Sequence, residues 1–451
     1  MAKEINMTTG HPAKLLLRFS FPLMIANVIN LLYTVVDSII VGQAVGVTAL
    51  AALGAVAFPY LIFAGASRAM TEGFGVKIAE YFGGGDEKSL RNVVKNALLL
   101  TLIISLVIAI VGFFASEPLL VITNTPKSVQ PYGKLYFRIL CVGLPVTMIY
   151  SMLATILRAF GNSKTPLYAV TISCVINIVL DVLFVVIFHW NVVGAAVATV
   201  IAQLSSCIPC ALQLKKLNVL WQEDPDNKIN RNTCRELLSL GVPLSLQGGI
   251  IFIGNLVVQS VINSQGELVL AGFTATGKLY GLLEVATSSF GYATTTYVSQ
   301  NVGGKNFRRI LSGVKSIGII ALSTSLILMV ILLAFGRFML SGFISAADPN
   351  APAILQIGYE YLTTMCKFLP VLYLLYIFRS SIQGMGNTII PMVSGIVELI
   401  IRVMTVLTLP KFVGLSGIYL NDVNAWIAAC LLLAIAAVIC LKNMKKKLSD
   451  A

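Results

Sequence analysis

The sequence predicts an all-α polytopic membrane protein with about twelve transmembrane helices in two parallel-repeat six-helix bundles that face a central cleft. Three observations predict it: the composition, the length of the apolar segments and an internal repeat. Hydrophobic residues make up 57% of the 451 residues and charged residues 11%, and the mean hydropathy is +0.87. Soluble domains carry about 25% charged residues. The chain is therefore expected to fold in a lipid bilayer.

The apolar segments have the length that a membrane-spanning helix needs. About 20 residues of helix cross a hydrocarbon core about 30 Å thick. Polar or glycine-containing loops separate these segments, so each reads as one span. The expected spans are residues 15–41, 49–72, 92–115, 134–158, 165–188, 192–214, 237–263, 268–296, 309–334, 353–381, 388–410 and 423–442.

The second half of the chain repeats the first. Six residues recur at an offset of 225: Gly133, Tyr136, Pro145, Gly161, Asn162 and Pro166 reappear as Gly358, Tyr361, Pro370, Gly386, Asn387 and Pro391. Each half holds an even number of spans, so both enter the membrane from the same side and the repeat is parallel. The expected domains are an N-terminal six-helix lobe (1–216), a cytoplasmic linker (217–236), a C-terminal six-helix lobe (237–442) and a basic cytoplasmic tail (443–451).

The net charge of +13 is explained by topology. Lys and Arg cluster in alternate loops, whereas the intervening loops around residues 43–48, 189–191 and 263–267 carry none. This is the positive-inside pattern, and it predicts that both termini are cytoplasmic. We therefore expect no nucleic-acid partner. The polar N-terminus predicts no cleaved signal peptide. The two histidines and the scattered cysteines favour neither a zinc site nor a catalytic centre, so we expect no enzyme activity and no cofactor.

Four polar residues lie where the sequence is otherwise apolar. Asn177 and Asp181 are four residues apart and share a helix face, Asp37 lies near the end of the first span, and Thr199 lies in the sixth. An intramembrane carboxylate costs about 2.5–3.5 kcal/mol unless it has a partner, a proton, a cation or water. We interpret the four as one ion or proton site. Two close carboxylates favour a bound proton, and their oxygens with those of Asn177 and Thr199 suit Na⁺. The sequence leaves both open.

The two acids are absent from the second repeat. At the offset of 225, Asn177 matches Arg402 and Asp181 matches Val406. At the offset of 221 that relates Pro22 to Pro243, Asp37 matches Val258. Glycines and prolines of the scaffold recur in both halves, but the paired acids do not. This asymmetry favours a functional role over the alternative of polar helix ends near the membrane interface.

Two further residues of the first span are candidates for function. Pro22 lies about four turns before Asp37 and loosens the helix there. It is either a bend that changes with protonation of Asp37 or a static kink echoed by Pro243. Tyr33, one turn before Asp37, either contacts a ligand or packs in the core.

The second half carries three more intramembrane charges of interest. Glu398 and Arg402 are four apart, which predicts a structural ion pair within one helix. Glu284, in the eighth span, is a candidate for the substrate cavity.

These residues lie in segments that resemble the MATE (multidrug and toxic compound extrusion) family. The segments are FPLMIANVINLLYTVVDSIIVG (21–42), ILRAFGNSKTP (156–166), NIVLD (177–181), GAAVATV (194–200) and TTYVSQNVGG (295–304). The resemblance implies a V-shaped pair of bundles and efflux coupled to Na⁺ or H⁺. Asp37, Asn177, Asp181 and Thr199 match the coupling site of the DinF-like branch. Gln259 stands in the seventh helix, where the NorM-like branch has an acid, so the resemblance does not extend to that second site.

The function expected on these grounds is a cation-coupled antiporter that exports amphipathic, often cationic, drug-like small molecules by alternating access. It would act as a monomer in the cell (inner or plasma) membrane, with no cofactor beyond the coupling Na⁺ or H⁺. The alternative is a flippase for lipid-linked precursors or polysaccharides. Such anionic cargo calls for several cationic residues in the cavity, whereas the candidates in the first lobe are acidic. A passive channel calls for a polar stripe along several spans, which the sequence lacks.

Overall fold

The structure is a computed structural model that describes residues 5–123, 125–222, 228–344 and 349–449. These residues form helices and no strands. Most helices are longer than 20 residues, because the sequence contains long apolar runs in which only single prolines interrupt the pattern. The first half forms α1 Pro12–Ala44, α2 Val47–Gly84, α3 Glu87–Ile122, α4 Gln130–Ala159, α5 Lys164–Asp181, the π-helix η1 Val182–Ile187, α6 Asn191–Lys215 and α7 Asn218–Trp221. The second half forms α8 Arg231–Ser264, α9 Glu267–Gly303, α10 Phe307–Ser341, α11 Ala351–Lys367, α12 Leu369–Gly384, α13 Ile389–Thr408, α14 Pro410–Val413 and α15 Leu415–Ser449.

The number of spans agrees with the sequence prediction. In the described residues, 11 helical segments are long and apolar enough to cross a membrane, and α11 with α12 makes a twelfth if the pair is one span. The pair is bent by 51° at Phe368, immediately before Leu369 and Pro370. Pro145, the repeat partner of Pro370, lies inside an unbroken α4. The protein is therefore a multi-pass membrane protein.

Contacts divide the chain into two compact units. The first comprises residues up to Thr9 and Arg18–Ser245, and the second comprises Gly10–Leu17 and the residues from Leu246 onward. The division lies inside α8 and not in the expected linker 217–236, of which residues 223–227 lie outside the described residues. A hydrogen bond to α3 ties the start of α8 to the first unit. The Asn230 backbone N–H, directly before α8, donates to Asn96 Oδ1 of α3 at 3.1 Å.

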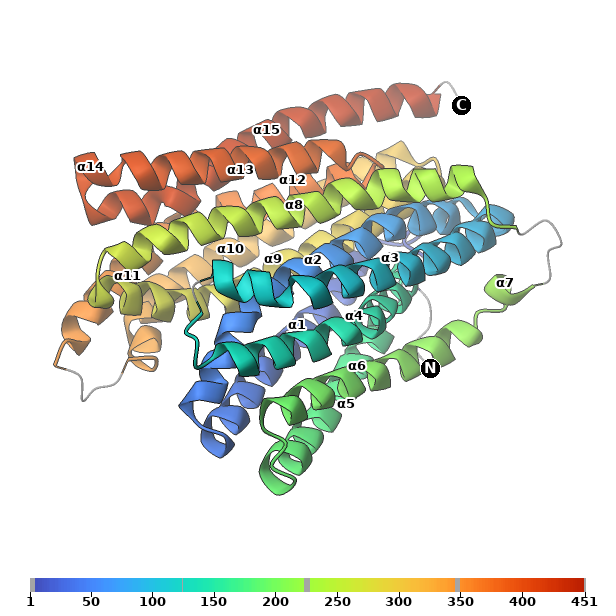
Figure 1. Ribbon diagram of the computed structural model, residues 1–451. Helices are drawn as coiled ribbons and strands as arrows, with labels where there is room; N and C mark the ends of the chain where they lie inside the picture. The colour runs from blue at the N-terminus through green and yellow to red at the C-terminus, as the bar shows by residue number, and fades with distance from the viewer. Residues whose placement is uncertain (1–4, 124, 223–227, 345–348, 450–451) are drawn as a thin grey trace. The chain divides into compact units, whose positions relative to one another are not determined.

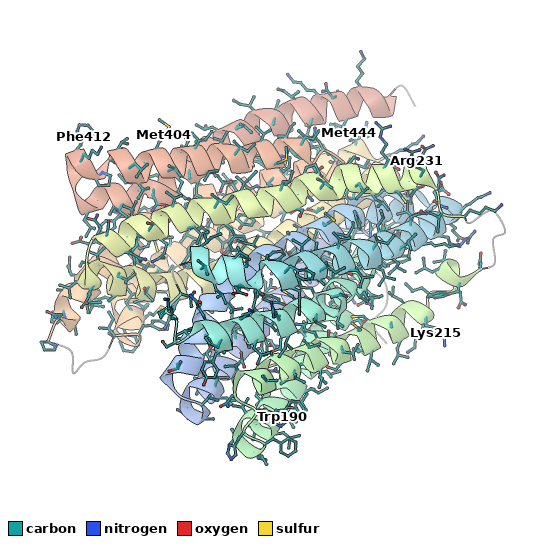
Figure 2. All side chains as sticks on the ribbon, viewed as in Figure 1. Trp190, Lys215, Arg231, Met404, Phe412 and Met444 are labelled. Carbon is teal, nitrogen blue, oxygen red and sulfur yellow. The ribbon has the colours of Figure 1, made fainter. Side chains whose placement is uncertain are left out.

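The first unit is held together by α2, α3, α4 and α6 around two apolar clusters. α5 and α6 lie side by side, joined at one end by the turn that carries Trp190 (Figures 1 and 2). His189 and Asn191 flank this residue with positive φ angles of 55° and 53°, which allow the chain to reverse within a few residues. α6 can approach closely because Gly194 has no side chain: a Cβ there would lie 3.0 Å from Phe184.

The second unit has one large apolar cluster in which α9 packs on α11 and α12, and α13 lies along α15 (Figure 1). Its exposed faces are apolar where they would meet lipid. Met404 on α13 and Phe412 on α14 project from the outer side of their helices, and Phe412 is 83% exposed (Figure 2).

The sequence repeat builds the same local structure in both units. Asn162 and Asn387 each accept a hydrogen bond from the backbone N–H three residues later, at 3.0 and 3.1 Å. The preceding Gly161 and Gly386 have positive φ angles of 78° and 82°, which favour glycine. The repeated Gly-Asn pair therefore forms the turn between α4 and α5 and again between α12 and α13.

Candidate functional site

Three helices of the first unit carry the polar residues predicted from the sequence. Tyr33 and Asp37 lie one turn apart on α1, and Asp37 is only 8% exposed. Asn177 and Asp181 occupy the last turns of α5 and are fully buried, with 0% exposure. Thr199 lies in the small-residue part of α6, where neighbouring helices can approach closely.

The helix that carries Asp181 changes its form directly after this residue. α5 ends at Asp181 and continues as the π-helix η1. The Phe188 N–H bonds to the Leu183 carbonyl five residues earlier, at 2.9 Å. π-turns inside helices are frequent at functional sites. In the second half, α13 ends at Thr408, two residues after the position that matches Asp181, and α14 begins with Pro410.

Side chains from α1, α5 and α6 meet at one place. The carboxyl groups of Asp37 and Asp181 lie near enough to interact electrostatically. Near them, the Tyr33 hydroxyl donates a hydrogen bond to Thr199 Oγ1 at 3.2 Å, and Thr199 donates to the Ala195 carbonyl at 2.9 Å. The structure thus brings Asp37, Asp181, Tyr33 and Thr199 together, with Asn177 one turn from Asp181.

Several buried polar atoms of this group have no partner among the described residues. They are Asp37 Oδ1, both carboxylate oxygens of Asp181, and Oδ1 and Nδ2 of Asn177. A buried unsatisfied polar atom costs about 1–3 kcal/mol, and more when it is charged. The described residues form no group of three or more His, Cys, Asp or Glu that could hold a metal. The donor set is instead two carboxylates with amide and hydroxyl oxygens, which fits a proton or a hard monovalent cation.

Tyr136 was not predicted as a site residue. It is buried on α4 and interacts electrostatically with Asp37, Tyr33 and Asp181. The sequence marked it only as a member of the repeat. Its partner Tyr361 also lies beside a carboxylate, because its hydroxyl donates to Asp422 Oδ2 at 2.7 Å. The repeated tyrosine thus lies within electrostatic range of an acid in both units, but a hydrogen bond to the acid is seen for Tyr361.

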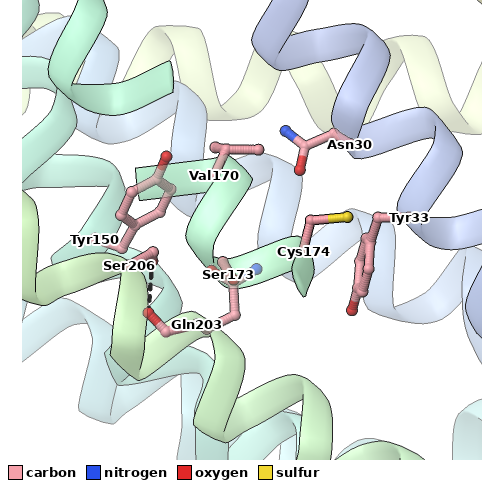
Figure 3. A pocket seen from close by; sticks show the side chains of 8 residues that line it. All are labelled: Asn30, Tyr33, Tyr150, Val170, Ser173, Cys174, Gln203 and Ser206. Carbon is pink, nitrogen blue, oxygen red and sulfur yellow. Dashed lines mark hydrogen bonds between the residues drawn. The ribbon is translucent and has the colours of Figure 1, made fainter. Parts of the chain in front are cut away.

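A small cavity lies beside these residues in the first unit (Figure 3). About 20 Å³ of it is open to the centres of water molecules, which is room for a water or a small ion. Asn30, Cys174 and Tyr33 lie on one side of the cavity in Figure 3, and Tyr150, Gln203 and Ser206 on the other. Its lining residues are Asn30, Tyr33, Tyr150, Val170, Ser173, Cys174, Gln203 and Ser206. The lining is neutral, and Tyr33 connects it to the two acids.

Glu284 lies in a separate network of the second unit. It is half-buried on α9 and accepts a hydrogen bond from the Tyr376 hydroxyl at 2.7 Å. The Arg379 guanidinium lies 5.8 Å from the centre of the Tyr376 ring. Among the described residues, Glu284 forms no ion pair. Its hydrogen-bond donor among the described residues is thus a neutral hydroxyl.

The predicted ion pair between Glu398 and Arg402 is wrong. Glu398 pairs with Arg379 of α12, and Arg402 pairs with Asp422 of α15 at 3.0 Å and also bonds to Asn255. The i, i+4 spacing permits a pair within α13, but Glu398 and Arg402 are buried and each pairs with a charge on another helix. Arg379 and Asp422 were missed because the sequence does not state which helices are neighbours.

The comparisons with known proteins agree with this architecture. The family model MatE matches residues 22–183 and 243–408, one match in each half. The chain is 27% identical to the probable multidrug resistance protein YpnP of Bacillus subtilis, over 93% of each chain. It is 22% identical to the FAD transporter of Shewanella oneidensis, over 90% of each chain.

Solved structures share the fold. A crystal structure described as MATE in the bent conformation matches with a TM-score of 0.90 and 23% identity, and the match covers 98% of both chains. The family assignment rests on the match of the family model to both halves of the chain. This protein belongs to the MatE family, whose members are membrane transporters and not enzymes.

Proposed function

We propose that this protein is an antiporter that exports amphipathic, often cationic, small molecules in exchange for Na⁺ or H⁺. The observation that carries the proposal is the set of buried atoms without partners on Asp37, Asn177 and Asp181. Relatives named as multidrug resistance and FAD transporters support export of small organic molecules. The flippase alternative gains no support from these relatives.

The coupling step follows from two carboxylates in a low-dielectric place. Both cannot remain ionised and unpaired there at low cost, so one takes up a proton, or a cation binds between them. Asn177 Oδ1 and Thr199 Oγ1 are the neutral oxygens that would complete a Na⁺ site. Occupation removes the repulsion between Asp37 and Asp181, and release restores it. The local packing around α1, α5 and α6 therefore depends on the coupling ion.

Pro22 is the element of α1 that we assign to the response. α1 is one helix from Pro12 to Ala44, with Pro22 inside it. A proline has no backbone N–H to donate to the carbonyl four residues earlier, so α1 is easiest to bend near residue 22. Bending there would move Tyr33 and Asp37 together, which couples ion binding to alternating access.

The orientation follows from the charges at the helix ends. Lys215 lies at the end of α6 opposite to Trp190 (Figure 2), and the turn with Trp190 has no Lys or Arg. By the positive-inside rule we place the end with Lys215, and both termini, in the cytoplasm. The protein would act as a monomer in the cell (inner or plasma) membrane, and each unit would move as one body.

The proposal is tested with purified protein in liposomes under separately imposed Na⁺ and H⁺ gradients. Efflux of ethidium is measured for the wild type, Asp37→Asn and Glu267→Gln. Glu267 is an exposed carboxylate at the start of α9, so its variant is the matched control. We expect one gradient to drive efflux in the wild type and the control but not in Asp37→Asn. The same assay is run with FAD and with other organic cargo. If neither gradient drives export of any of these compounds by the wild-type protein, the proposal of coupled export is wrong.

A further inference from the structure

A groove on the second unit has the size of a ligand site. It lies between α11 and α15, and its volume is about 320 Å³, within the range of small-molecule pockets. Its lining residues are Glu360, Thr363, Thr364, Ser416, Tyr419 and Leu420. Five of the six carry a carboxylate or a hydroxyl group. The acids that couple transport in our proposal are all in the first unit, so this groove is a different site.

The exposed side of α11 is built to meet water. It presents Gln356, Glu360 and Lys367, and no large hydrophobic side chain of α11 is exposed. α10 is the opposite, since Phe335 and Phe338 on it are 59% and 80% exposed. A carboxylate or an ammonium that faces lipid costs several kcal/mol. The groove therefore opens to an aqueous space, whereas α10 faces the bilayer.

Glu360 supplies a negative charge that no cation of the described chain neutralises. Its carboxylate accepts hydrogen bonds from Gln356 Nε2 at 2.7 Å and from the Tyr419 hydroxyl at 3.4 Å. Neither donor is charged. The other two acids of this part of the unit, Glu398 and Asp422, each have an arginine. Glu360 is thus the acid of α11–α15 that is left to bind a cation from outside.

The wall of the groove is held in place from behind. The Tyr419 ring stacks on Tyr361 with 5.8 Å between the ring centres, and it lies 5.7 Å from Phe273. The Tyr361 hydroxyl bonds to Asp422, which pairs with Arg402. Tyr419 therefore cannot turn away without breaking a buried stack. Tyr419 is only 3% exposed, so it forms a fixed back wall beside the Glu360 carboxylate.

We propose that this groove is a recognition site for organic cations. The Glu360 carboxylate would bind an ammonium or iminium group, the hydroxyls of Thr363, Thr364 and Ser416 would accept its N–H groups or those of attached amines, and the exposed edge of Tyr419 would form the back wall. The role of the groove in cargo choice rests on the proposed export function. Binding itself needs no gradient, so the site can be tested without transport.

The experiment measures ethidium binding by fluorescence anisotropy with the protein in lipid nanodiscs. The background is Asp37→Asn with Asp181→Asn, so that the acids of the first unit do not contribute. We expect Glu360→Gln to raise the Kd about tenfold and Glu267→Gln to leave it unchanged. Thr364→Trp fills the groove without changing the charge and should weaken binding as strongly. A Glu360→Asp variant should bind nearly as the parent does, which checks that the loss is not misfolding.

Three results would overturn the site. Equal Kd values for the parent, Glu360→Gln and Thr364→Trp would show that ethidium binds elsewhere. Displacement of ethidium by NaCl but not by choline chloride, dependent on Glu360, would assign the groove to an inorganic cation. Binding of an anionic dye as tight as that of ethidium would show that the Glu360 charge does not select cations. If ethidium binding depends on Glu360 but liposomes show no coupled transport, the proposed export function is wrong and the site remains. If coupled transport is found but binding does not depend on Glu360, the site alone is rejected.

Discussion

Tyr33 of α1 donates a hydrogen bond to Thr199 of α6 across 3.2 Å, one helical turn from Asp37. The same Thr199 hydroxyl donates to the Ala195 carbonyl, so its proton is engaged and its lone pairs face Tyr33. A cation that used Thr199 Oγ1 as a ligand would compete with the Tyr33 hydroxyl for these lone pairs. A proton bound on Asp37 or Asp181 would leave the Tyr33–Thr199 bond intact. This difference separates the two coupling ions.

Thr199→Val is therefore expected to act on Na⁺ coupling and not on H⁺ coupling. The substitution removes one oxygen and no charge, while the branched shape of the side chain is kept. If Na⁺ is the ion, Na⁺-driven ethidium efflux should fall at least fivefold while any H⁺-driven efflux persists. Thr199→Ser keeps the hydroxyl and is the control. Wild-type efflux by Thr199→Val under a Na⁺ gradient would exclude Thr199 as a ligand.

Asp37→Asn and Asp181→Asn should each abolish gradient-driven export. Asparagine has nearly the shape of aspartate, but it does not titrate near neutral pH and offers no charge to Na⁺. Insertion and folding should be unaffected, because removal of an intramembrane charge eases both. Initial efflux rates measure the loss of export, and the elution profile of the detergent-solubilised protein checks that the variants are folded. If both variants export at the wild-type rate, the site in the first unit is wrong, and Glu284 becomes the next candidate.

The helices could be predicted because each depends on a local property. An apolar run of the required length needs no knowledge of its neighbours, and the Gly-Asn turns at residues 161 and 386 are fixed by a few adjacent residues. The group around Asp181 was also accessible, since Asn177 and Asp181 stand out in an apolar helix. The inference that Asp37 joins this group rested on the cost of an intramembrane carboxylate, and the family resemblance matched the same residues.

What the sequence did not predict depends on contacts between distant helices. Glu398 could pair with Arg402 by spacing alone, but the choice of Arg379 depends on where α12 lies. Glu360 and Tyr419 are 59 residues apart and line one groove only because α11 packs on α15. The boundary inside α8 depends on hydrogen bonds to α3. Periodicity within one helix carries no information about these contacts.

The Arg379–Glu398 pair gives a prediction on stability. Both side chains are buried, at 8% and 7% exposure, so loss of one leaves the other charge unpaired. Removal of one partner of a buried pair destabilises by about 3–5 kcal/mol, whereas replacement of both by apolar residues is often neutral. Arg379→Met should therefore lower the thermal midpoint in detergent strongly, and Arg379→Met with Glu398→Leu should restore most of it. A double variant no more stable than Arg379→Met would contradict the pairing.

Two helix caps next to basic loops should respond differently to pH. Asp86 caps α3 and Asn306 caps α10, each through a backbone N–H three residues later. Hydrogen bonds from the Ser89 side chain and backbone hold the pKa of Asp86 below its ordinary value. Its contribution is therefore complete above the unfolded pKa, about 3.9, and is lost as the pH falls through the lower folded value. Asn306 does not titrate.

Asp86→Ala and Asn306→Ala should each destabilise by about 0.5–2 kcal/mol at pH 7. Thermal midpoints between pH 3 and pH 7 measure the effect. The difference between wild type and Asp86→Ala should shrink toward pH 3, and that for Asn306→Ala should stay constant. Asp86→Asn keeps the cap without the charge and serves as the control. Parallel pH profiles for the two alanine variants would show that the Asp86 charge has no part in the cap.

The final prediction concerns orientation in the membrane. Gly46 and Gly266 precede α2 and α9 with positive φ angles of 106° and 96°, so the two tight turns that they form are equivalent in the repeat. Neither turn has Lys or Arg nearby, whereas the turn at Gly85 is followed by Lys88 and Arg91.

Epitope tags inserted at Gly46 or Gly266 should bind antibody on intact cells. Tags at Gly85 or after the C-terminus should do so only after permeabilisation, since positive loops stay in the cytoplasm. A tag at residue 226 tests the linker in the same way. Labelling of the Gly46 tag only in permeabilised cells would reverse the orientation, and labelling of Gly46 and Gly266 from opposite sides would contradict the parallel repeat, because six spans must separate the two turns.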